Sequence, residues 1–271
     1  MRNILPGVVL SVAAALGVMA EMSAPAVAQG RGGKKAQPLP YKATPRTADG
    51  KPDFSGVYHA PGYEPGAPRS KSGEGFAHNI ARDMNPEDVP MLPWAKETFD
   101  KRFGDLSKDD PEGLCLPMGT PRVNPYPWKV VQTDTLFVIL YEGNVHSYRQ
   151  VFLDGRPHAK DVKDTWWGDS IGHWEGDTLV VDSVGMNDKA WIDADGHPRT
   201  KQAHFIEKFT RPEWGKVDIE ITIDDPGAYS KSWKVTEHAQ LAPTWEISEN
   251  ICNENHDENG DNLDVKHLVG K

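Results

Sequence analysis

From Lys129 onward, apolar and polar residues alternate with a period of two, in runs that are separated by turn residues. Such alternation is typical of strands that bury one face and expose the other. The runs are KVVQT, TLFVILYE, HSYRQVFLDG, DSIGHWEGDTLVVDSVGM, HFIEKFTRP, KVDIEITIDD, SWKVTEHAQL and TWEISENICNEN. In the fourth run, Glu175, Gly176 and Asp177 predict a tight turn that divides it into a hairpin.

These runs predict an all-β protein. About eight or nine antiparallel strands with short turns form a meander, and closing such a sheet removes its exposed edges. We therefore expect an antiparallel up-and-down barrel, with a β-sandwich as the alternative. Residues 51–271 are predicted to form this one domain, because the sequence contains no internal repeat.

The first part of that domain, 51–128, is dense in proline and is predicted to wrap around the barrel. One short helix is expected near 94–106, since Pro93 precedes a run with helical spacing. The residues that would share one face of this helix are Ala95, Phe99, Phe103 and Leu106. We expect the helix to pack across an end or a wall of the barrel.

The N-terminal sequence predicts a secretory signal peptide at 1–28. Arg2 gives a positive start, 5–19 is almost wholly apolar, and 26–28 reads Ala-Val-Ala, as at a cleavage site. The apolar run is too short for a membrane anchor, and no later stretch is long and apolar enough to span a bilayer. We therefore expect a periplasmic or secreted protein, with a flexible Gly-, Lys- and Pro-rich leader at 29–50.

Charge narrows the choice of partners. The formal net charge is −10, and an acidic surface repels phosphate backbones and anionic lipids. The sequence has no glycine-rich phosphate loop, and the space outside the cytoplasm offers no pool of ATP or NADH. We therefore predict a small-molecule partner, no nucleic acid, no membrane span and no cofactor.

The only cysteines are Cys115 and Cys252. In an oxidising compartment a disulfide between them is favoured over two buried free thiols. Neither cysteine lies in a CxxC motif, so the predicted bond is structural. It would tie the chain before the first strong strand to the end of the last one.

Nearly all of the mature chain is covered by the segments DGKPDFSGVY, CLPMGTPRVNPYPWKVVQT, LYEGN, YRQVFLDGRP, GHWEGDTLVVDSVGMND, ITIDDPGAY, ICNEN and HLVGK. Together they resemble a large family of secreted bacterial proteins that mostly lack an assigned activity. The resemblance implies export but transfers no reaction. Gly56, Val57 and Tyr58 also resemble the G-x-W start of lipocalin-type barrels, with tyrosine in place of tryptophan, which implies a calycin-like barrel.

Three carboxylates alternate with apolar residues of their own strand. Because one face of every barrel strand lines the interior, Glu249, Glu207 and Asp182 are predicted to point inward. The strand at 217–224 instead has an ordinary polar outer row. The apolar residues opposite that row are Val217, Ile219, Ile221 and Ile223.

The strand HSYRQVFLDG is ambiguous, because Tyr148 lies on one face and Arg149 on the other. An inward Arg149 would pair with Glu207 or Glu249. In one hypothesis these groups, together with His204, form a catalytic floor in which burial raises a carboxyl pKa toward values that suit acid–base chemistry. In the other, they form a satisfied salt-bridge network that fixes strand register.

Histidines give weaker signals. His173 alternates with Ile171, so it is predicted to be a packed core residue or an inward base. His197 and His204 flank one segment, where they would shuttle protons or bind a metal ion with Asp193 or Asp195. The sequence has no HExxH or HxH motif, so no metal site is predicted.

Four tryptophans are candidate ligand contacts. Trp166, Trp167 and Trp191 fall in predicted loops, and Trp245 lies in the last predicted strand. Their rings either pack the core or frame the entrance of a chamber for an aromatic or apolar ligand.

The function expected from these features is that of an exported barrel that binds a small apolar or aromatic organic molecule in its lumen. The alternative is a cofactor-independent acid–base enzyme, a lyase, isomerase or hydrolase, that acts on a small organic molecule in the same cavity. Convergence of Glu207, Glu249 and His204 on one cavity would favour the enzyme. Carboxylates locked onto arginines would disfavour it.

Overall fold

The computed structural model describes residues 39–61, 79–123, 126–143, 147–249 and 251–252. The predicted signal peptide lies outside them. All described elements belong to one compact unit, Pro38–Lys271. Among the described residues, no helix combines the length and hydrophobicity needed to cross a membrane.

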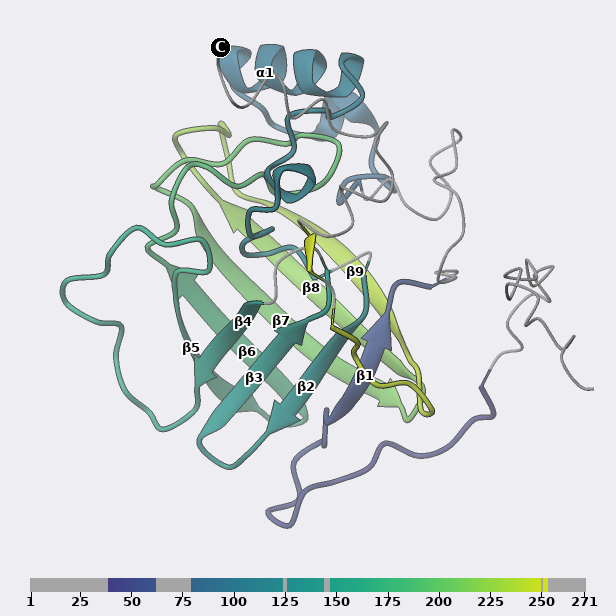
Figure 1. Ribbon diagram of the computed structural model, residues 1–271. Coiled ribbons are helices and arrows are strands. Elements are labelled where there is room, and N and C mark those ends of the chain that lie inside the picture. The colour runs from purple at the N-terminus through teal and green to yellow at the C-terminus, as the bar shows by residue number, and fades with distance from the viewer. Residues whose placement is uncertain (1–38, 62–78, 124–125, 144–146, 250, 253–271) are drawn as a thin grey trace, which may run out of the picture. The chain divides into compact units, whose positions relative to one another are not determined.

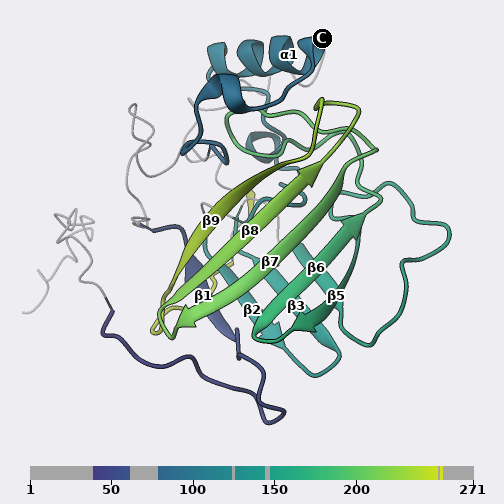
Figure 2. The same cartoon turned by 180° about the vertical axis from the view of Figure 1, so that it is seen from behind.

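The described residues form nine strands that close into a barrel, which confirms the predicted all-β fold (Figure 1). The strands are β1 Gly56–His59, β2 Trp128–Gln132, β3 Leu136–Tyr141, β4 Ser147–Phe152, β5 Asp169–Glu175, β6 Thr178–Val184, β7 His204–Glu213, β8 Lys216–Asp224 and β9 Trp233–Leu241. Each strand pairs with the next, and β9 pairs with β1. Figure 2 shows the strands β5 to β9 from behind.

One pair departs from the predicted up-and-down order. β4 and β5 run parallel, and only two residue pairs join them, Val151 with Ser170 and Phe152 with Ile171. Parallel neighbours need a crossover connection, and residues 153–168 supply it in the form of a long loop (Figure 1). The β4–β5 seam is therefore held by far fewer backbone pairs than the long antiparallel ladders are.

Side-chain alternation places the core as predicted. Val217, Ile219, Ile221 and Ile223 of β8 are fully buried, and each such side chain contributes roughly 1.5–3 kcal/mol by leaving water. The predicted hairpin turn joins β5 to β6, where Gly176 has a φ of 62°. Glycine adopts this left-handed conformation without steric cost.

The prediction of a last strand in TWEISENICNEN is wrong, because residues 244–249 form no strand after β9. The barrel is already closed by the pairing of β1 with β9, so no sheet edge is left for another strand. The segment instead makes side-chain contacts with the barrel. Trp245 stacks on His59 with ring centroids 4.9 Å apart.

The predicted helix is present as α1, Pro93–Gly104, over one end of the barrel (Figure 1). Its predicted apolar face is only partly buried. Ala95 is buried, whereas Phe103 is 56% and Leu106 88% exposed. The reason is that α1 packs against loops rather than on a barrel wall, and Phe99 contacts His197 there, with ring centroids 4.2 Å apart.

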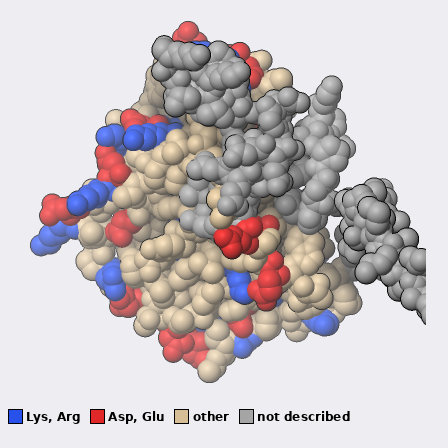
Figure 3. Space-filling view, in the orientation of Figure 1, with Lys and Arg blue, Asp and Glu red and all other residues tan. Residues whose placement is uncertain are grey.

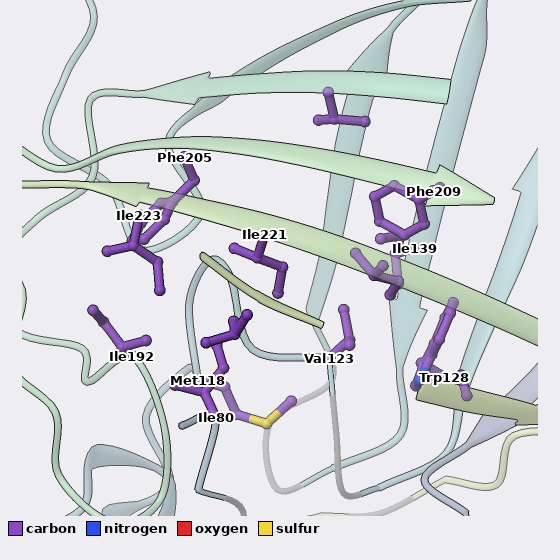
Figure 4. Packing of buried hydrophobic residues seen from close by; sticks show 14 of the residues in the cluster. Ile80, Met118, Val123, Trp128, Ile139, Ile192, Phe205, Phe209, Ile221 and Ile223 are labelled. Atoms are coloured by element: carbon purple, nitrogen blue, oxygen red, sulfur yellow. The ribbon is translucent and has the colours of Figure 1, made fainter. Parts of the chain in front are cut away.

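The mouth of the barrel under α1 is filled by side chains. Residues 118–123, which we call the plug, are buried throughout. Met118 and Ile80 lie opposite Ile223 of β8 in Figure 4, within one continuous core cluster. The proline-rich segment therefore contributes directly to the core.

Part of the segment predicted as a flexible leader makes defined contacts. The Lys42 carbonyl accepts a hydrogen bond from the Trp214 amide at 2.9 Å. Arg46 forms an exposed ion pair with Asp177 at 2.6 Å. These contacts join the chain before β1 to turns between later strands.

The predicted disulfide between Cys115 and Cys252 is present, and the two residues are 137 positions apart. It ties the chain just before the plug to the segment that follows β9. The bond therefore links the segment between α1 and β2 to the segment that follows the last strand.

We predict that replacing both cysteines by serine lowers the free energy of unfolding by about 4–5 kcal/mol, because the unfolded chain gains loop entropy. Denaturant unfolding of the mature protein, monitored by tryptophan fluorescence, measures the change. Wild-type protein under reducing conditions is the matched control and should lose as much stability. A thiol assay on denatured, unreduced wild type that finds free thiols would contradict the prediction.

Candidate functional site

Two of the predicted site residues meet inside the barrel. Arg149 of β4 and Glu207 of β7 are both buried, and the guanidinium donates to both carboxylate oxygens, with Nη1 to Oε1 at 3.0 Å. The predicted inward position of Glu207 is thus confirmed. Of the two candidate residues on β4, Arg149 is therefore the one that faces the barrel interior.

Serines complete this interior cluster. Arg149 Nε donates to Ser170 Oγ of β5 at 3.1 Å, and Nη2 donates to Ser183 Oγ of β6 at 2.7 Å. Tyr141 lies nearby, and burial raises the pKa of its hydroxyl, while Arg149 opposes that shift. The carboxylate is locked onto an arginine, an arrangement that supports the hypothesis of a satisfied network and disfavours catalysis here.

The remaining members of the predicted catalytic floor lie elsewhere. Glu249 is exposed on the irregular segment after β9, so its predicted inward position is wrong. Tyr148 is 60% exposed, because Arg149 takes the inner face of β4. The His204 side chain points away from Glu207 along β7 and is 38% exposed. Strand alternation allows only one of two adjacent positions to face inward.

His204 belongs to a cluster on the outer face of the barrel. Its Nε2 contacts Asp182 Oδ1 at 2.7 Å, and His158 Nε2 contacts the same oxygen at 3.1 Å. His158 Nδ1 lies 2.9 Å from Asp169 Oδ2. Asp182 therefore faces outward, contrary to prediction, and the cluster fastens the crossover loop to β5, β6 and β7.

The other predicted ligand contacts do not converge on one chamber. His173 is exposed on the outer face of β5, where Glu175 lies 3.5 Å away, so neither predicted inward role holds. Trp167 stacks on Tyr141 at 4.4 Å. The Trp166 carbonyl accepts a hydrogen bond from Arg199 at 3.0 Å, whereas Trp245 lies outside the strands.

Charged groups that the sequence analysis missed are buried at the α1 end. Arg122 of the plug is paired with Asp110 at 3.0 Å and Glu112 at 2.6 Å. Arg199 donates to three backbone carbonyls, those of Thr120, Trp166 and Asn187. These cations cross-link the loops that close the barrel mouth. Isolated arginines in an irregular segment give no sequence signal of burial.

A buried acid–histidine pair lies beside these cations. Asp193 Oδ2 is 2.6 Å from His197 Nδ1 and accepts a hydrogen bond from the Ile80 amide at 2.9 Å. Burial alone would raise the pKa of Asp193, but His197 and the backbone donors lower it to about 2. Among the described residues, His197 Nε2 has no hydrogen-bond partner. The sequence analysis grouped His197 and His204 with Asp193. The structure brings His197 and Asp193 together, whereas His204 lies with Asp182 on the outer face.

Next to this pair, a cavity of about 360 Å³ opens between α1 and Trp191. Thr98, Lys101 and Arg102 of α1 line it, together with polar residues of the following turn. In that turn Leu106 and Ser107 have φ values of 57° and 54°. Strained backbone of this kind is concentrated at functional sites.

Arg102 connects the cavity to the loop that carries the acid–histidine pair. Its guanidinium lies over the Trp191 ring, 4.3 Å from the centroid, and Nη1 donates to the Gly196 carbonyl at 3.1 Å. Burial lowers the pKa of Arg102, while Asp110 opposes that shift. Of the predicted ligand contacts, only Trp191 lines this cavity.

Outside the cavity, two further features are the surface charge and the side chains that can ligate a metal. On the face shown in Figure 3, lysines and arginines alternate with aspartates and glutamates instead of forming one basic field. Within the described ranges, no three His, Cys, Asp or Glu side chains are grouped so that they hold a metal ion. The α1 end is therefore the best candidate site in the described part of the chain.

No protein-family model, curated protein or solved structure matches this chain.

We predict that Glu207→Gln lowers the free energy of unfolding by about 3–5 kcal/mol, because it leaves the Arg149 charge buried without a counter-ion. Denaturant unfolding measures the loss. Arg149→Met combined with Glu207→Leu removes both charges and should cost less than the single variant. The matched control is Glu220→Gln, which removes an exposed carboxylate of β8 and should change stability little. Equal effects of Glu207→Gln and the control would contradict the prediction.

We predict that Asp193 stabilises the fold in a pH-dependent way. Its pKa in the folded protein, about 2, lies below the ordinary value of an aspartate, so the stabilisation is present above pH 4 and is lost as the pH falls toward 2. The lost amount is about 2 kcal/mol. The difference in unfolding free energy between wild type and Asp193→Asn should shrink over this range. A difference that stays constant would contradict the assignment.

Proposed function

We propose that this protein is an exported small-molecule-binding protein whose ligand occupies the cavity between α1 and Trp191. The expected location, the lumen, receives no support, since side chains fill the barrel interior under α1. The single observation that carries the proposal is the cavity itself. Its volume of about 360 Å³ falls within the range of small-molecule sites.

The walls of the cavity support ligand binding for a physical reason. Trp191 is almost fully buried by its neighbours, and Arg102 is fixed by its contacts with Trp191 and Gly196. Side chains that are already ordered lose little entropy when a ligand arrives. A mixed aromatic and polar lining suits an organic molecule that has one apolar part and one polar group.

An acid–base enzyme at the same end of the barrel is the second candidate. The observation that favours it is the Asp193–His197 pair, in which the carboxylate holds Nδ1 and leaves Nε2 without a partner among the described residues. This is the arrangement in which a histidine acts as a general base. Against it, His197 is only 2% exposed and lies under Phe99.

We predict that filling the cavity abolishes binding. Saturation-transfer NMR with a library of small aromatic and polar fragments should detect ligands of the mature wild-type protein. Thr98→Trp, which places a large ring in the cavity wall, should lose them. Thr236→Trp puts the same ring on the exposed outer face of β9 and should retain them. If Thr98→Trp binds the same fragments, or wild type binds none, the proposal is wrong.

A further inference from the structure

Arg102 is held in one orientation at the edge of the cavity. Its guanidinium lies over Trp191, and Nη1 is used by the Gly196 carbonyl. A Cβ atom at Gly196 would come within 2.6 Å of the Arg102 Cβ, so glycine is what allows α1 to approach this loop. The remaining donors of the guanidinium therefore point in a defined direction.

Those donors are not engaged. Nε and Nη2, which project from the same edge of the planar group, have no hydrogen-bond acceptor among the described residues. This edge presents two parallel N–H groups at the spacing of the two oxygens of a carboxylate. Because Arg102 also lines the cavity, these two donors make its guanidinium a candidate site for a planar oxyanion.

The charges around the cavity agree with an anionic ligand. The lining includes three cationic side chains and two carboxylates. One of each is neutralised, because Lys108 lies 3.3 Å from Asp105. Lys101, which also lines the cavity, forms no ion pair within the described residues. The side chains that line the cavity thus carry one more positive than negative charge, while the carboxylates of Asp110 and Asp193 also act on Arg102 from nearby.

We propose that Arg102 selects ligands that carry a carboxylate and binds that group through Nε and Nη2. This inference rests on the proposed function, because it assigns a ligand class to the same cavity. The apolar part of the ligand contacts Trp191, and Lys101 attracts the anion without fixing its orientation. Arg102 is then the residue that determines specificity, because only its guanidinium can donate to both carboxylate oxygens of the ligand at once.

The test compares aromatic carboxylates with their own amides, beginning with benzoate and benzamide, on the mature full-length protein by titration calorimetry and ligand-observed NMR. A charge-assisted bidentate contact predicts that wild type prefers the carboxylate of each pair by about tenfold or more. Arg102→Gln should abolish the difference in affinity between the carboxylate and the amide of each pair. Lys101→Gln, the matched control for charge alone, should keep the preference.

The outcomes separate the two proposals. If wild type binds carboxylate and amide equally, or if Arg102→Gln keeps the preference, the carboxylate assignment is wrong while the cavity remains a binding site. If no member of the set binds wild type, both proposals fail. Thermal unfolding checks that Arg102→Gln is folded. If Arg102→Gln does not fold, Arg102→Lys replaces it, because lysine keeps the positive charge but cannot donate to two oxygens in parallel. If Arg102→Lys keeps the full preference for the carboxylate, the assignment is wrong.

Discussion

The barrel depends on a buried ion pair beside one of its two shortest backbone ladders, that between β4 and β5. Only two residue pairs join β4 to β5. The guanidinium of Arg149 on β4 forms hydrogen bonds with Ser170 on β5, Ser183 on β6 and Glu207 on β7. One side chain therefore joins four strands across this seam. Because a buried arginine without its counter-ion is strongly unfavourable, only the correct strand register satisfies these groups.

That requirement also explains why the interior does not offer a reaction chamber. Both carboxylate oxygens of Glu207 accept hydrogen bonds from the Arg149 guanidinium, and the side chain is fully buried, so it does not reach a substrate. Large apolar side chains such as Phe137, Phe205 and Phe209 fill the space around the pair. The polar groups in the lumen thus serve the architecture, and chemistry at a solvent-accessible site has to take place elsewhere.

The α1 end has the opposite character, because irregular segments rather than strands build it. Loops carry many backbone polar groups that need partners when they are buried. Arg199 supplies donors to carbonyls of three segments, and Asp193 accepts from the amides of Ile80, Gly196 and His197. Buried charges therefore make these loops rigid, and that rigidity fixes Arg102 and Trp191 at the cavity.

The sequence by itself determined the strands β2 to β9, the barrel, the disulfide and the inward position of Glu207, because each of these follows from local alternation or from residue type. It placed Trp191 among the candidate ligand contacts for the same reason. Only the tertiary structure decided that Glu249 is exposed, that β4 and β5 run parallel, and that Arg102 faces a cavity. These depend on which segments meet after the barrel closes, and no local pattern encodes contacts between an irregular loop and a distant helix.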